Sequence, residues 1–162
     1  MKRILLLILM VFTLSGLKAQ DTLTIGTGTS KHSNMIIPGY FGFHTGAYLF
    51  TSDEMLNQAC VINSLALDME SVASGANRSL KIYLKEVVEQ TIPTSLIFND
   101  LLDGATLVYD HSAINVTANS WSELVFDSPF IYSGTSSLLV IYEGEGCSSG
   151  GGCSASIYMT QM

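Results

Sequence analysis

The chain has 162 residues, of which 48% are hydrophobic and 13% are charged, and this length is typical of a single domain. Fourteen acidic residues against seven basic ones give a net charge of −7 at pH 7. Such a surface repels phosphate backbones, so we expect no nucleic-acid partner.

The N-terminal residues have the layout of a secretory signal peptide. Lys2 and Arg3 form a basic start, residues 4–14 are almost all apolar, and small residues follow up to Ala19. The apolar run is about eleven residues long, whereas a membrane-spanning helix needs roughly 20, so we expect no transmembrane span. No cysteine lies near Ala19 to carry a lipid anchor. The pattern therefore predicts an exported protein, secreted or held at the cell surface.

We expect residues 1–20 to be the signal peptide and residues 21–162 to form one module. Without the leader, four basic residues remain against all fourteen acidic ones, which gives a net charge of −10. Export places the cysteines in an oxidising compartment. Cys147 and Cys153 flank a short Ser/Gly loop, which predicts a disulfide between them. Cys60 lies among apolar residues and is expected to be a small buried thiol.

Past the leader, the chain reads as short strands separated by turns. Residues 22–25 are expected to form a first strand, and the Gly-rich residues 26–30 a loop. Residues 47–50 end an aromatic-rich stretch and are expected to form a strand. The continuous apolar run at residues 138–142 is typical of a central strand covered on both faces. Residues 157–159 look like the start of a last strand.

Three segments between these elements alternate with a period of two, as half-buried strands do. The alternating positions that we expect to share a face are Val61, Asn63, Leu65, Leu67 and Met69, then Leu80, Ile82 and Leu84, and last Ser122, Leu124 and Phe126. Residues 94–102 are expected to be a loop with one helical turn. No long amphipathic helix and no alternation of strands with helices occurs, which disfavours a parallel-sheet enzyme.

Several phrases in a fixed order carry a resemblance to a known family. They lie at residues 25–29, 39–41, 80–85 and 104–110, at Trp121, and at residues 128–140. The chain resembles a β-sandwich module of secreted Bacteroidetes proteins, which often carry a type IX secretion sorting domain at the C-terminus. The resemblance covers nearly all of residues 24–159. It implies a jelly-roll-like or fibronectin-like module that occurs beside adhesins and proteases and has no catalytic residues of its own.

The fold that we predict is therefore all-β: an antiparallel, jelly-roll-like β-sandwich with about eight strands in two sheets. The family's last strands include an Arg-Pro-Asn-like phrase that this sequence lacks before Met162. The module is then either shortened at its C-terminus or the front piece of a longer polypeptide with further domains.

No motif in the sequence indicates catalysis, and no enzyme is expected. No Gly-x-Ser-x-Gly elbow occurs, and His32, His44 and His111 have no metal-ligand spacing, so we expect surface or aromatic-packing histidines. We expect no cofactor other than calcium. Four acids beside glycines or turns are weak calcium candidates, because calcium prefers carboxylate and carbonyl oxygens. These candidates are Asp100, Asp103, Glu143 and Glu145.

The function that we expect is that of a non-catalytic extracellular or cell-surface module, a spacer or a recognition domain of a larger secreted protein. The alternative is a carbohydrate-binding module attached to a secreted hydrolase, because exposed aromatic rings stack on sugars. The ligand candidates are Tyr40, Phe41, Tyr48 and Trp121, and the partner would be an extracellular glycan or protein. The competing expectation is that these aromatics fill the core, and Trp121 in particular is expected to pack rather than be displayed.

Overall fold

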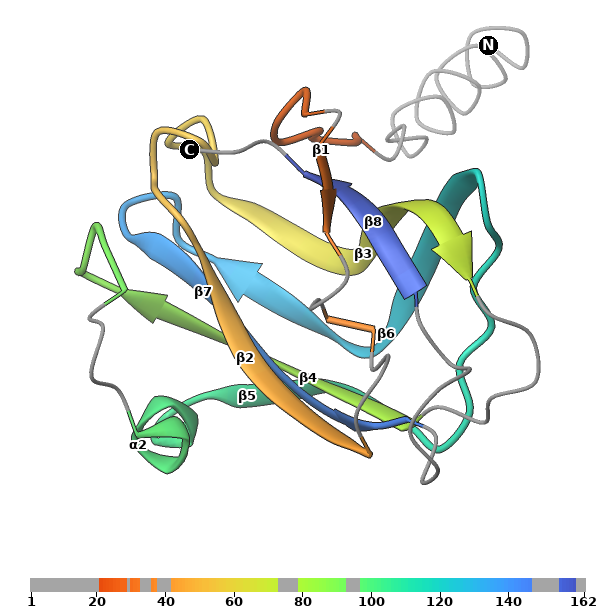
Figure 1. The fold of residues 1–162 in the computed structure, drawn as a ribbon. Coiled ribbons are helices and arrows are strands. Elements are labelled where there is room, and N and C mark those ends of the chain that lie inside the picture. Colours follow the sequence, from red (N-terminus) through yellow and green to blue (C-terminus); the bar gives the residue numbers. More distant parts are fainter. Residues whose placement is uncertain are drawn as a thin grey trace, which may run out of the picture.

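The computed structural model describes residues 21–28, 30–32, 36–37, 42–72, 79–92, 97–146 and 155–159, with only the backbone for residues 31, 32 and 155–159. Within these residues it has eight strands and one short helix (Figure 1). The elements are β1 (Ser30–His32), β2 (Phe43–Phe50), β3 (Cys60–Val72), β4 (Ser79–Val87), α2 (Phe98–Leu102), β5 (Thr106–His111), β6 (Ser120–Tyr132), β7 (Ser137–Glu145) and β8 (Ala155–Met159).

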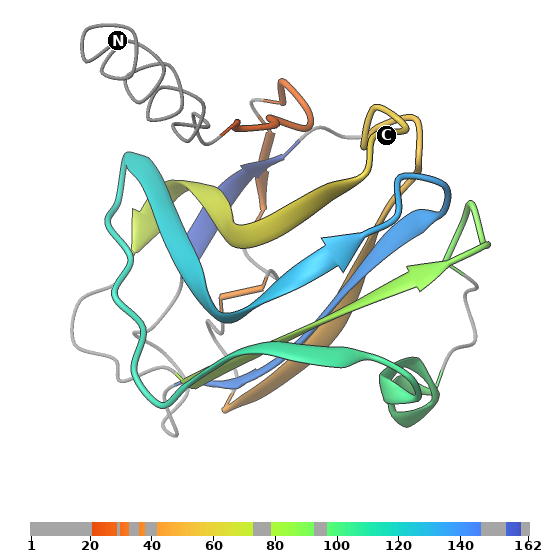
Figure 2. The same ribbon diagram turned by 180° about the vertical axis from the view of Figure 1, so that it is seen from behind.

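The strands form two four-stranded sheets, with the orders β1-β8-β3-β6 and β2-β7-β4-β5. Every paired strand is antiparallel to its neighbour. Consecutive strands alternate between the two facing sheets except for β4 and β5, which pair in one sheet, and this order is that of an eight-stranded jelly roll. Figures 1 and 2 show the two layers from opposite sides. The predicted jelly-roll-like β-sandwich is thus confirmed.

The core lies between the sheets and is made by alternate residues of the facing strands. On β4, Leu80, Ile82 and Leu84 are at most 2% exposed, and on β6 Leu124 and Phe126 are buried against them. Burial of one such side chain contributes about 1.5–3 kcal/mol relative to its exposure. The period-two pattern read from these two segments is therefore confirmed.

Strand β7 is covered on both faces, as its unbroken apolar run predicts. It lies between β2 and β4, and its inward residues Leu138, Val140 and Tyr142 join the core cluster. Leu139 and Ile141 point to the opposite face, because successive side chains of a strand alternate. They are nevertheless only 5% and 0% exposed.

The expected single face of β3 is wrong in its first half. Leu67 and Met69 are buried, but Val61 is 54% exposed and Asn63 is also exposed. The cause is a register shift against β6: Ile62 pairs with Phe130, whereas Ser64 pairs with Val125. A bulge of this kind changes which residues point inward, so the alternation changes phase along the strand.

The predicted first strand is also displaced. Residues 22–25 form no strand, and the first strand of the described residues is β1, which pairs with β8. Strand β8 has β3 on its other side, so both its edges are occupied and residues 22–25 have no place beside it. The helical turn expected in residues 94–102 is confirmed by α2. No helix in the described part of the chain has the length and apolarity to cross a membrane.

Candidate functional site

The main exposed apolar surface of the β3–β6 pair lies on the outer side of its sheet. Trp121 is 59%, Val125 62% and Ile131 77% exposed on β6, and Val61 of β3 lies directly opposite Ile131. Strand β6 turns its even-numbered residues into the core, so the odd-numbered ones point outward. Trp121 and Val125 lie four residues apart on β6, and we call this pair the Trp121 face; the Val61–Ile131 pair lies at the other end of β6, roughly 33 Å from Trp121. The expectation that Trp121 packs in the interior is wrong.

Two carboxylates lie beside Trp121 on this surface. Asp68 of β3 pairs directly with Trp121, and directly opposed residues of an antiparallel pair share a face. Glu123 is two residues along β6 from Trp121, exposed, and opposite Ala66. The surface therefore combines one large aromatic ring, aliphatic side chains and acidic hydrogen-bond acceptors. The exposure of Val125 was missed from sequence because both faces of the alternating β6 segment carry apolar residues.

Tyr48, another ligand candidate, belongs to the interior. Its ring packs against the core and stacks on Tyr142 with ring centroids 5.6 Å apart. Burial, and then the neighbouring Tyr142 hydroxyl, raise the pKa of Tyr48 above its ordinary value. Gly46 makes room for this arrangement, since a Cβ there would lie 2.3 Å from the Tyr142 hydroxyl oxygen. Tyr40 and Phe41, the remaining aromatic candidates, lie outside the described residues.

Two histidines pack on aromatic rings, as expected from sequence. His44 stacks on Tyr142 at 5.7 Å, and burial lowers the pKa of His44. His111 stacks on Tyr109 at 4.2 Å and contacts Asp127 through Nε2 and Oδ1 at 3.0 Å. The other oxygen of Asp127 accepts the backbone N–H of Asp110 at 2.9 Å. Asp127 of β6 therefore links its own sheet to strand β5 of the other sheet.

The four calcium candidates do not come together. Asp100 lies in α2, and Asp103 directly follows that helix. Lys85 of β4 connects this region to β7, because it pairs with Leu139 and its Nζ donates a hydrogen bond to the carbonyl of Asp103 at 2.5 Å. The two glutamates lie four to six residues further along β7, roughly 13–20 Å away. No group of three metal-ligating side chains occurs in the described part of the chain.

The glutamates of β7 have local roles. Glu143 accepts a hydrogen bond from the hydroxyl of Tyr83 at 2.7 Å. Burial, followed by this bond and the charge of Glu143, raises the pKa of Tyr83 to about 12. Glu145 is exposed at the end of the strand. Glu143 is therefore engaged in cross-strand contacts of the sheet.

The cysteine expectations have different outcomes. Cys60 is exposed rather than buried, because it is the first residue of β3 and lies at the end of the sheet. Partial desolvation by its neighbours still raises the pKa of its thiol, in the direction expected from its apolar surroundings. The predicted Cys147–Cys153 disulfide lies outside the described residues.

The Trp121 face is the strongest candidate site in the described residues, because it exposes the chain's single tryptophan on a regular surface. A rigid sheet holds its side chains in place, so they need little ordering when a partner binds. No protein-family model, no curated protein and no solved structure matches this chain.

Proposed function

We propose that the chain is an exported, non-catalytic recognition module of a larger secreted protein, and that it binds an extracellular partner through the Trp121 face. The observation that carries the proposal is the 59% exposure of Trp121, with Val125 62% exposed four residues along the same strand. An exposed apolar patch of this kind, rimmed by polar groups, often marks an interaction surface. A spacer domain needs no such patch.

Tryptophan is the side chain that most often dominates binding energy at a protein interface. It offers about 150–250 Å² of surface with few rotatable bonds. Asp68 and Glu123 at the rim would select against acidic partners and favour neutral or basic ones. These properties favour a protein partner with an apolar or basic patch.

The extracellular setting rests on the sequence. The basic start, short apolar run and small residues before Gln20 support export. The net charge of −10 after residue 20 supports solubility outside the cell. The resemblance to modules of secreted Bacteroidetes proteins supports a place beside other domains of the same polypeptide.

A carbohydrate-binding role is the second candidate, and the surroundings of Trp121 favour it. An exposed indole can stack on a sugar ring, while the carboxylates of Asp68 and Glu123 can accept hydrogen bonds from its hydroxyls. Phe43 is also exposed, but it lies on β2 in the other sheet. A sugar site would therefore depend on one ring among the described residues.

The test uses Trp121→Ala and a matched control, Leu107→Ala. Leu107 is 43% exposed and lies on β5 in the other sheet. A photo-reactive residue at position 125 should cross-link an extracellular protein of the producing bacterium, and Trp121→Ala should weaken that binding by about thirtyfold. Leu107→Ala should leave it unchanged. A glycan array probed with the same three proteins tests the sugar alternative.

The outcomes separate the candidates. Glycan binding that requires Trp121, without a cross-linked protein, would replace the protein partner by a sugar. Binding of any partner that survives Trp121→Ala at full strength would show that the Trp121 face is not the recognition surface. A folded protein that binds neither glycan nor extracellular protein would leave the spacer role as the correct one.

A further inference from the structure

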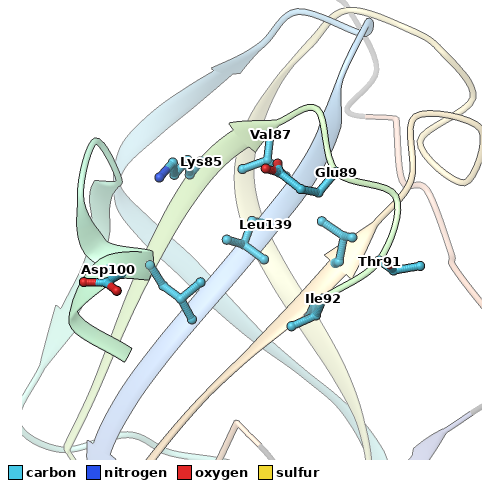
Figure 3. A pocket seen from close by; sticks show the side chains of 9 residues that line it. Lys85, Val87, Glu89, Thr91, Ile92, Asp100 and Leu139 are labelled. Atoms are coloured by element: carbon cyan, nitrogen blue, oxygen red, sulfur yellow. The ribbon is translucent and has the colours of Figure 1, made fainter. Parts of the chain in front are cut away.

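The outer side of the β2-β7-β4-β5 sheet carries a hollow that is separate from the Trp121 face. Its floor is Leu139 of β7, which is flanked in register by Leu49 of β2 and Lys85 of β4. Figure 3 shows Leu139 at the centre, with Ile92 and Asp100 on different sides of it. The two sheets face each other across the core, so the hollow and the Trp121 face lie on opposite sides of the molecule.

The hollow is bordered by residues that follow β4 and by helix α2. Glu89, Thr91 and Ile92 follow β4 and line the hollow around Leu139, together with Asp100 and Leu101 of α2. Its apolar lining consists of Leu49, Val87, Ile92, Leu101 and Leu139. This lining explains why an outward-pointing leucine is only 5% exposed.

The volume of the hollow sets the size of what it can hold. It measures about 180 Å³. Sites for drug-sized ligands are larger, roughly 300–1,000 Å³. An occupant is therefore a small molecule or a single side chain with an apolar body.

The charges at the rim set the sign of the occupant. Glu89 and Asp100 line the hollow with carboxylates, and Lys85 is its one basic residue. The ammonium of Lys85 already donates to the carbonyl of Asp103 at 2.5 Å. The rim therefore has an excess of negative charge, and its one cation is held by the main chain beside α2.

We propose that this hollow binds a small organic ammonium ion, with its apolar body against Leu139 and Leu49 and its charge toward Glu89 or Asp100. The charge excess at the rim and the excess of acidic residues in the whole chain attract a cation, while the leucine floor requires an apolar body. A simple hydrated metal ion lacks that body. A carboxylate ligand would be repelled by the two rim acids.

The probes are phenethylammonium chloride, as a free amine, and lysine with blocked amino and carboxyl termini, as a partner's side chain. Chemical-shift changes of backbone amides should be largest at Thr91, Leu101 and Leu139. We expect a dissociation constant on the order of millimolar for a ligand of this size. Phenylpropionate, with the opposite charge, should not bind, and binding should weaken as salt is added.

Three substitutions at the rim make the test specific, because their effects have different signs. Glu89→Gln and Asp100→Asn should each weaken binding by about two- to fivefold, and the larger loss marks the ammonium end. Lys85→Met keeps the stem but removes the like charge, so binding should tighten by about two- to fivefold. Glu145→Gln is the matched control, an exposed acid on β7 remote from Leu139, and should change nothing.

Binding of phenethylammonium alone assigns the hollow to a free amine, and binding of blocked lysine alone assigns it to a side chain of a partner. Absence of binding by both at about 10 mM overturns the proposal. It is also overturned if phenylpropionate binds equally well, or if Lys85→Met weakens binding. None of these outcomes bears on the Trp121 face.

Discussion

The outer sides of the two sheets differ in what happens to their outward-pointing apolar residues. On β7, Leu139 and Ile141 point away from the core and are 5% and 0% exposed. On β6, Trp121 and Val125 also point away from the core and are 59% and 62% exposed. Strand β7 is central, with a strand on each side, and residues after β4 and α2 line the hollow around Leu139, whereas β6 is an edge strand. Outward apolar residues on β7 therefore stabilise the fold, and those on β6 are available for binding.

The same substitution in both regions tests this contrast with the largest effect. Ile141→Asp places an unpaired carboxylate at a fully buried position, which should cost several kcal/mol and prevent stable folding. Val125→Asp should cost about 1 kcal/mol or less, because water solvates the new charge. Urea unfolding of both variants measures the difference. Similar losses from the two substitutions would contradict the contrast between the two sides.

Two glycines with positive φ, one in the turn between β6 and β7 and one after α2, provide a second, smaller comparison. Gly134, in the β6–β7 turn, has φ +81°, and a Cβ there would lie 2.4 Å from the backbone nitrogen of Ala59. Gly104, after α2, has φ +70° and no neighbour within 4 Å of its Cβ position.

Gly134→Ala should therefore destabilise by about 3 kcal/mol or more, since a backbone clash adds to the left-handed strain. Gly104→Ala should cost only the strain, about 1–2 kcal/mol. Thermal unfolding midpoints measure both. If the two variants melt together, the close contact between the β6–β7 turn and Ala59 is absent in solution.

The contacts of Asp127 with Asp110 and His111, which link the two sheets, should have the smallest effect on stability, and this effect depends on pH. The backbone N–H of Asp110, followed by His111, lowers the pKa of Asp127 below its ordinary value of 3.8. A carboxyl group with a lowered folded-state pKa stabilises the fold above its unfolded pKa, and this contribution is lost as pH falls through the folded pKa.

Asp127→Asn should therefore lower the urea midpoint at pH 6, and the gap to the parent protein should close below about pH 3.8. Glu145→Gln, at an exposed acid at the end of β7, is the control for charge alone. A gap that stays constant down to pH 2 would show that ionised Asp127 does not hold the sheets together.

Some features of the candidate sites follow from sequence and others do not. The chain's single tryptophan at the head of an alternating strand was a ligand candidate on sequence alone. Its exposure was not predicted, because a period of two shows that two faces differ without showing which face is inward when both carry apolar residues. Tyr48 looked equally suitable, but Gly46 lets the Tyr142 ring lie beside it in the interior.

By itself the sequence determined the strand character of β4, β6 and β7 and the all-β sandwich, because alternation and apolar runs are local properties of each segment. Only the tertiary structure decided the phase change in β3, the place of the first strand and the cover over Leu139. Each of these depends on contacts between segments far apart in the chain. The burial of an outward residue is decided by what lies over it, and a strand's own pattern carries no information about that cover.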